Sequence, residues 1–93
     1  MRVEYIDPTQ VVLNRAIPVD LGYRDAIQEG GFDDENPGVR KRADGQYDVV
    51  KGETQLRAIL ALIEEDAFCY DLQSGHPVRA SELYRRLRMC VFD

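Results

Sequence analysis

The hydrophobic pattern changes its period at Gly52, and this change constrains the fold more than any other feature of the sequence. Before it, residues 39–43 and 46–51 flank Asp44-Gly45, a dipeptide that favours a type I′ hairpin because both central residues need positive φ. After it, apolar side chains recur at i, i+3, i+4 and i+7, the pattern of a helix that packs one face on a sheet. These positions are Leu56, Ile59, Leu60 and Ile63. A strand pair followed at once by a helix is therefore predicted.

Shorter signals predict elements before this unit. Residues 3–6 have the pattern of a strand that Asp7-Pro8 stops, and residues 11–13 that of a second extended piece. Asp20 can cap a helix that Gly30-Gly31 ends, with its apolar positions on one face. Those positions are Leu21, Tyr23, Ala26 and Ile27.

The last third of the sequence predicts a strand, a turn and a helix. Residues 67–72 have the pattern of a strand, and residues 73–77 contain the residues typical of a turn. Ser81 can cap a last helix with four apolar residues inward, namely Leu83, Tyr84, Leu87 and Val91. With a loop over 32–38, the elements predict an α+β fold, a small mixed sheet on which about three helices pack.

Length and composition indicate one small globular domain. A chain of 93 residues fits one domain, so we expect residues 1–93 to form a single unit. Apolar residues make up 44% and charged residues 31%, which is typical of a folded chain. No apolar run approaches the ~18 residues of a membrane span, and the first residues lack the apolar segment of a secretion signal. We therefore expect a cytoplasmic protein with no membrane partner.

The cysteines and the histidine give no sign of a metal centre. Cys69 and Cys90 lie far apart, and neither belongs to a Cys-x-x-Cys pair. We expect both to be buried, reduced thiols. His76, the one histidine, stands in a Gly-His-Pro turn with no second ligand type beside it, and we expect it to face solvent.

The net negative charge of the chain argues against binding along duplex DNA. There are 12 Lys and Arg against 17 Asp and Glu, a net charge of −5, whereas each phosphate contact needs a cation. Basic residues gather at Arg40-Lys41-Arg42 and at Arg85, Arg86 and Arg88 of the predicted last helix. Strand and helix geometry let about four of these charges converge. We therefore expect no nucleic-acid partner.

The strand-to-helix junction suits an anion. A strand that runs into a glycine and then a helix directs free backbone N–H groups and the positive end of the helix dipole at one point. Gly52 lets the backbone approach closely, and Arg57, one turn into the helix, can neutralise charge. The structural alternative is that Glu53 occupies the first turn because negative charge is stabilised there.

This segment resembles the ParB family, whose nucleotide-binding domain carries Gly-Glu-Arg-Arg-x-Arg-Ala after a strand of the type Asp-Gly-x-Tyr-x-Val-Val-x. The matching residues are Gly52, Glu53, Arg57 and Ala58 in the motif and Gly45, Tyr47, Val49 and Val50 in the strand. Upstream, Glu29-Gly30-Gly31-Phe32 closes the predicted helix and Pro37-Gly38-Val39-Arg40 leads into the hairpin, in the family's order. The resemblance covers residues 3–63 and implies a ParB and sulfiredoxin fold.

Departures from the motif affect the chemistry that the resemblance implies. The family's two consecutive arginines are replaced by Thr54 and Gln55, which removes two charge-assisted contacts to a nucleotide. The candidate nucleotide or anion site is Gly52, Glu53, Thr54, Gln55 and Arg57, and we expect no cofactor beyond a weakly held nucleotide with magnesium. Sulfiredoxins place a catalytic cysteine in this loop, which has none here, so sulfinic acid reductase activity is not expected.

Three classes of function remain. The first is a stand-alone ParB-like binding module from a phage or plasmid, more a binding protein than an enzyme, which regulates or inhibits a protein partner. The second, implied by kinases of this fold, is a nucleotide-dependent kinase or hydrolase with Glu53 as catalytic base and metal ligands among Asp44, Asp48 and Asp71. The third is a nucleic-acid binder or nuclease that uses the basic clusters, with Tyr84 stacked on a base.

Overall fold

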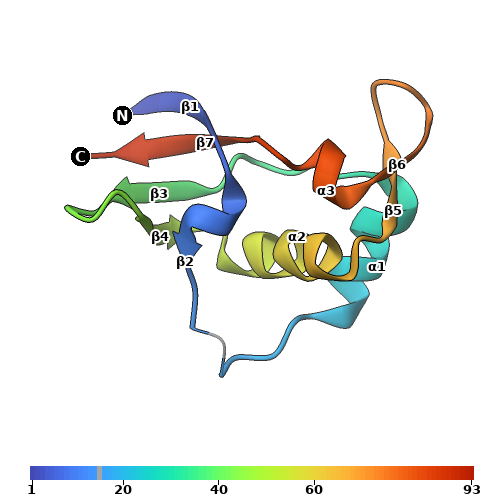
Figure 1. Cartoon of the computed structure of the whole chain (residues 1–93), viewed down its shortest axis with the longest axis horizontal. Coiled ribbons are helices and arrows are strands. Elements are labelled where there is room, and N and C mark those ends of the chain that lie inside the picture. The colour runs from blue at the N-terminus through green and yellow to red at the C-terminus, as the bar shows by residue number, and fades with distance from the viewer. Residues whose placement is uncertain (15) are drawn as a thin grey trace.

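Strands from both ends of the sequence meet in one mixed sheet (Figure 1). The computed structural model describes residues 1–14 and 16–93, and the strands of this sheet lie in the order β1, β7, β3, β4, β2. Their bounds are Arg2–Ile6 for β1, Val11–Val12 for β2, Gly38–Lys41 for β3, Tyr47–Lys51 for β4 and Leu87–Phe92 for β7. β7 pairs antiparallel with β1 and parallel with β3, while β4 pairs antiparallel with β3 and parallel with β2.

Three α-helices and a second hairpin complete the fold of the described residues. The helices are α1 (Leu21–Gly30), α2 (Glu53–Glu65) and α3 (Ala80–Leu83), and the hairpin joins β5 (Phe68–Asp71) to β6 (His76–Arg79). Figure 1 shows α1, α3 and the β5–β6 hairpin at one end of the molecule and α2 in its middle, while the large sheet reaches to the other end, where both termini lie. The predicted α+β class is confirmed. No helix in the described ranges is long and apolar enough to cross a membrane.

α1 begins and ends where the sequence predicts. The Asp20 carboxylate accepts a hydrogen bond from the Tyr23 backbone N–H at 3.0 Å, which caps the first turn. At the other end, Gly31 has a φ of 84° and donates its N–H to the Ile27 carbonyl at 2.9 Å. Ile27 is buried and Tyr23 half-buried, as expected. Two further positions predicted to face the core, Leu21 and Ala26, are exposed, because α1 packs mainly on α2 and β5.

The core lies between α2 and one face of the large sheet. Its fully buried side chains come from both layers: Leu56, Ile59, Leu62, Val39, Met89 and Val91. Of the α2 residues predicted to face the core, Leu56 and Ile59 are buried, whereas Leu60 and Ile63 are only half-buried. Leu62, which was not predicted, is fully buried in the core. α1 covers α2 from a second side, and this contact shifts the buried face.

The predicted last helix is wrong. α3 covers only four residues, and Ser81 is not its cap but donates through Oγ to Asp66 Oδ1 at 2.7 Å. Residues 87–92 form β7, which has backbone partners on both sides. Leu87, Met89 and Val91 recur at every second position, so a strand fits these residues as well as a helix does. Pairing with β1 and β3 decides between the two patterns.

The β3–β4 hairpin is confirmed, but its turn is not the predicted type I′. Gly45 has a φ of 86°, whereas the φ of Asp44 is not positive. The Gly45 N–H donates to the Arg42 carbonyl at 3.1 Å, and the Arg42 N–H donates to the Gln46 carbonyl at 2.7 Å. These bonds define a three-residue loop that ends in a left-handed glycine.

Truncation of buried leucines tests the packing of α2. Leu56→Ala and Leu62→Ala should each lower the free energy of unfolding by about 2–5 kcal/mol, because each leaves a cavity in the core. Leu60→Ala should cost less because Leu60 is half-buried. Leu21→Ala is the matched control, with Leu21 68% exposed, and should change stability by less than about 0.5 kcal/mol. Urea unfolding measures all four variants, and equal losses at Leu62 and Leu21 would contradict this packing.

Candidate functional site

The junction between β4 and α2 depends on Gly52. This residue follows β4 directly, has φ 80° and ψ 30°, and is the N-cap of α2. A Cβ at this position would lie 2.4 Å from Gln55 Oε1 and 3.1 Å from Pro37 Cα. The left-handed backbone and the close loop before β3 both require glycine. Strand, glycine and helix thus follow one another as predicted.

The N-terminus of α2 has unsatisfied donors and an acidic side chain of its own. The Gly52 carbonyl accepts the first helical bond from the Leu56 N–H at 3.0 Å, and no described side chain caps the helix. The N–H groups of residues 53–55 carry the positive end of the helix dipole, which favours negative charge. Glu53 supplies that charge from within the first turn.

Arg57 is held by contacts inside the protein. Its side chain is only 7% exposed, and Nη2 donates to Glu53 Oε1 at 2.5 Å. Nη1 donates to two carbonyls of the connection between β2 and α1, those of Asn14 and Ile17, the latter at 3.3 Å. The guanidinium thus fastens this connection to the first turn of α2 and satisfies carbonyls that would otherwise need other partners.

Gln55 and Thr54 occupy different surroundings. Thr54 is exposed, whereas Gln55 is half-buried beside the loop that precedes β3. The Tyr23 hydroxyl donates to Asp34 Oδ2 at 2.7 Å, and this bond, followed by one from Gln55, keeps the pKa of Asp34 below its usual value. Partial burial, together with the bond to Asp34, raises the pKa of Tyr23 to about 12. A second carboxylate therefore stands beside the first turn of α2.

The five predicted site residues thus lie together but are largely engaged with one another and with neighbouring loops. Glu53 pairs with Arg57, and Gln55 contacts Asp34. A phosphate that approached the helix N-terminus would meet two carboxylates, while the arginine predicted to neutralise it is bound to the connection before α1. The arrangement ties two loops to α2.

Of the aspartates considered as metal ligands, Asp44 and Asp48 both pair with Arg42, at 3.3 and 3.7 Å, whereas Asp71 lies in the other sheet. Asp44 lies in the β3–β4 loop and accepts a hydrogen bond from the Gln46 N–H at 2.9 Å. Asp48 lies on β4, and Asp71 ends β5 and accepts from the Gln73 N–H at 3.1 Å. Residues 1–14 and 16–93 contain no group of three or more His, Cys, Asp or Glu that could hold a metal ion.

Because residues 87–92 form β7 and not a helix, the C-terminal basic residues lie differently from the prediction. Arg85 and Arg86 precede this strand and Arg88 lies on it, so their arrangement expected from a helix is wrong. Arg40 of β3 pairs in register with Phe92, which lies four residues after Arg88 on β7. Side chains alternate along strands, so Arg40 and Arg88 share one face of the sheet.

The remaining candidate residues have the exposure that the sequence predicts, but His76 lies on β6 and not in the predicted turn. Cys69 and Cys90 are buried free thiols on β5 and β7. Burial raises the pKa of Cys69, which keeps its thiol protonated. His76 is exposed at the start of β6, with Nδ1 3.3 Å from Ser74 Oγ.

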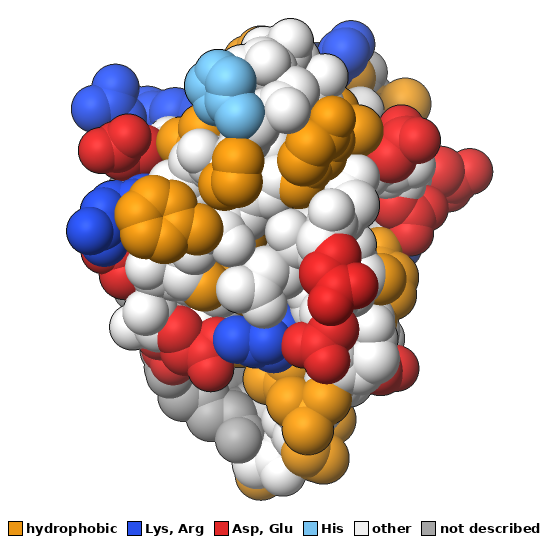
Figure 2. All heavy atoms as spheres, turned by 90° about the vertical axis from the view of Figure 1, so that its right-hand side faces the viewer, with side chains coloured by type: hydrophobic (Ala, Val, Ile, Leu, Met, Phe, Trp, Pro, Cys, Tyr) orange, Lys and Arg blue, Asp and Glu red, His pale blue; other side chains and the backbone are white. Residues whose placement is uncertain are grey.

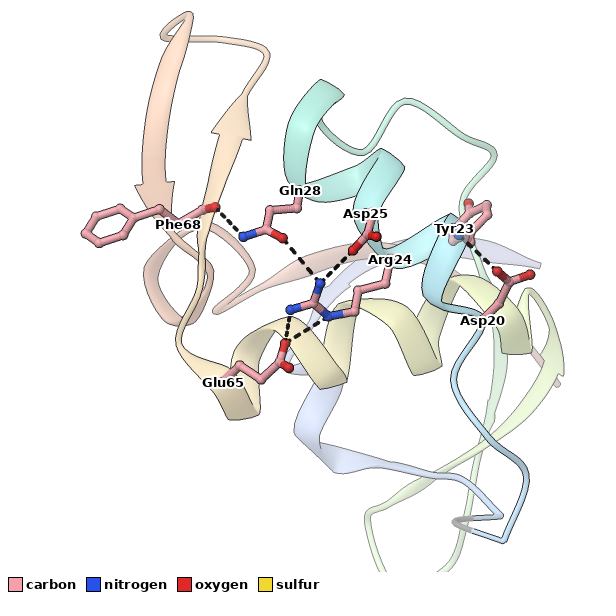
Figure 3. Close-up of polar contacts among 7 residues, drawn as sticks. All are labelled: Asp20, Tyr23, Arg24, Asp25, Gln28, Glu65 and Phe68. Atoms are coloured by element: carbon pink, nitrogen blue, oxygen red, sulfur yellow. Dashed lines mark hydrogen bonds and ion pairs between the residues drawn. The ribbon is translucent and has the colours of Figure 1, made fainter.

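A charged contact that the sequence did not reveal joins α1, α2 and β5 (Figure 3). Arg24 Nε donates to Glu65 Oε2 at 2.8 Å, and Arg24 Nη1 pairs with Asp25 at 2.8 Å. Gln28 accepts from Arg24 at 3.3 Å and donates to the Phe68 carbonyl at 3.3 Å. Gln28 stands at i+4 from Arg24, a visible helical spacing, but Glu65 is 41 residues away and gives no local signal. Figure 2 looks at this end and shows acidic side chains on both sides of a basic one.

Glycine-to-alanine substitutions separate the two reasons for a glycine at position 52, its positive φ and the close approach of Pro37. Gly45→Ala should cost about 1–2 kcal/mol of unfolding free energy, because its φ is positive while no atom lies within 4 Å of the added Cβ. Gly52→Ala should cost more, because its Cβ also meets the Pro37 backbone. Gly30→Ala has open space in α1 and should be neutral or stabilise by up to about 1 kcal/mol. Urea unfolding ranks the three, and equal losses at Gly45 and Gly52 would contradict the close approach of Pro37.

Replacement of Arg57 tests its structural role. Arg57→Met should lower the free energy of unfolding by about 2–3 kcal/mol, because charge-assisted hydrogen bonds to two carbonyls are lost. Arg85→Met removes an exposed arginine and should have almost no effect. Amide exchange of residues 16–19 should quicken in Arg57→Met alone. Unchanged stability and unchanged exchange would show that the guanidinium does not hold this connection.

The junction of β4 and α2 is thus a site in which a glycine, an acid and an arginine matching one motif fasten two loops to a helix. Its charges are satisfied mainly within the described part of the chain. No protein-family model matches the sequence, and no curated protein or solved structure is significantly similar to it.

Proposed function

We propose that the chain is a stand-alone ParB-like binding module, of a kind carried by phages or plasmids, which acts through a protein partner as a regulator or inhibitor. The observation that carries the proposal is the burial of Arg57, whose guanidinium binds Glu53 and two backbone carbonyls. The match of Gly52, Glu53, Arg57 and Ala58 to the motif supports the family. The use of Arg57 inside the fold supports a loss of nucleotide chemistry.

The other motif positions support the same conclusion. Thr54 and Gln55 carry no charge where the family has arginines. A nucleoside triphosphate at this helix would face Glu53 and Asp34 and would find no unpaired cation in residues 52–58. Charge-assisted hydrogen bonds contribute most to phosphate binding, so affinity here should be low.

The exposed face of the large sheet favours a protein as partner. Val3 and Tyr5 of β1 are 44% and 67% exposed, and Val50 of β4 is 43% exposed. Alternation along β1 places Val3 and Tyr5 on the face opposite Ile6, which points into the core. Apolar and aromatic side chains on an exposed surface are typical of protein–protein contacts.

Calorimetric titration tests the loss of nucleotide chemistry. CTP, ATP and GTP in magnesium buffer should each bind more weakly than about 1 µM, because Arg57 is engaged and the carboxylates repel phosphate. Gly52→Val, which blocks backbone approach, is the control for binding at this junction. Submicromolar binding of any of the three that Gly52→Val abolishes would overturn the proposal in favour of a nucleotide-dependent enzyme.

Capture from a native lysate tests the protein partner. The folded chain should retain a protein in stoichiometric amount, identified by mass spectrometry. An unrelated folded bait of the same net charge controls for ionic capture. The proposal fails if the two baits retain the same proteins, or if the chain retains only nucleic acid.

A further inference from the structure

The geometry points to a docking groove for an acidic peptide segment that carries one bulky apolar side chain, and this inference rests on the proposed function of binding a protein. The groove has a volume of about 440 Å³. It lies between the end of β1, the turn of the β5–β6 hairpin and the start of β7, elements that Figure 1 labels. We call it the tyrosine groove, after Tyr5 and Tyr70; Phe32, Leu72, Arg86 and Arg88 also line it.

The apolar lining of the tyrosine groove suits a bulky side chain. Tyr5 and Leu72 are 67% and 50% exposed, and both are large enough to cover such a side chain. Phe32 and Tyr70 are half-buried and belong to the wall beneath. The volume lies in the range of small-ligand pockets, so one aromatic or large aliphatic residue can be buried there.

The charged lining has cations without partners. Arg86 and Arg88 are exposed, and their side chains make no hydrogen bond or ion pair with any described residue. Asp71 also lines the groove, but its carboxylate is bound within its own turn, where it accepts a hydrogen bond from the Gln73 N–H at 3.1 Å. The arginines therefore remain available for carboxylates from outside.

The small local excess of positive charge favours a peptide over a nucleic acid. Two arginines and one aspartate line the groove, a difference of one positive charge, on a chain of net charge −5. A peptide can place two carboxylates against the arginines and keep the rest of its charge low. A nucleic acid brings a phosphate with every nucleotide, and these would meet the acidic body within the Debye length of about 8 Å.

Selection from a library of random short peptides displayed on phage supplies the probe. Selected peptides should be enriched in Asp and Glu around one aromatic or large aliphatic residue. On binding the unlabelled selected peptide, amide resonances of Tyr5, Tyr70 and Arg88 should shift in a ¹⁵N correlation spectrum. Enrichment of basic peptides, or resonance shifts confined to other parts of the chain, would overturn the proposal that this groove binds an acidic peptide.

Matched variants then test the arginines and the aromatic wall, with fluorescence anisotropy of the selected peptide. Arg86→Ala with Arg88→Ala should weaken binding about tenfold at low salt, because two exposed ion pairs are lost. Arg85→Ala with Lys41→Ala removes the same charge outside the groove and should have little effect. Tyr5→Ala should also weaken binding, whereas Phe68→Ala, an exposed aromatic outside the groove, should not.

The outcomes separate this inference from the proposed function. If the Arg86/Arg88 and the Arg85/Lys41 double variants bind the peptide with equal affinity, the groove is not the peptide site. Binding of the peptide to another surface would still be consistent with a protein-binding module. No selected peptide together with no protein retained from the lysate would contradict both. An oligothymidylate that binds more tightly than the peptides and depends on Arg86 and Arg88 would make the groove a nucleic-acid site and overturn the inference.

Discussion

The buried guanidinium of Arg57 is the contact on which the junction and its neighbouring loops depend. The chain must leave β2, cross to the start of α1 and come close to the first turn of α2 on the way. A connection of this kind has carbonyl groups without strand or helix partners, and buried carbonyls need donors. Arg57 provides donors for the carbonyls of Asn14 and Ile17 and is itself balanced by Glu53. One side chain thereby fixes the path of the connection.

The two residues that match the motif at this junction also have structural roles of their own. Gly52 is required by a left-handed backbone and by Pro37, and Arg57 by the carbonyls that it satisfies. Both residues therefore have structural roles that need no bound nucleotide. Thr54 and Gln55, the two positions that depart from the motif that the segment resembles, have no comparable role in the backbone. On the proposal made above, the partner contacts another surface.

Local signals were sufficient for some elements and not for others. The β3–β4 hairpin, α2 and the Asp20 cap of α1 follow from neighbouring residues and were predictable. β7 was not, because Leu87 to Val91 fit both periods and the decision comes from pairing with strands far away in the sequence. At the candidate site, the positions of Gly52 and Glu53 at the start of α2 were predictable from the sequence. The partners of Arg57 were not, because a backbone carbonyl has no sequence signature.

The position of β7 also determines the order in which the sheet can assemble. Arg2 of β1 is in register with Val91 of β7, so this pairing closes nearly the whole sequence into one loop. Loop closure of that length is entropically costly and slow, whereas the β3–β4 hairpin and α2 need only nearby residues. Until β7 docks, β1 and the facing edge of β3 have unpaired backbone groups. That interval is when one copy of the chain is most open to pairing with another.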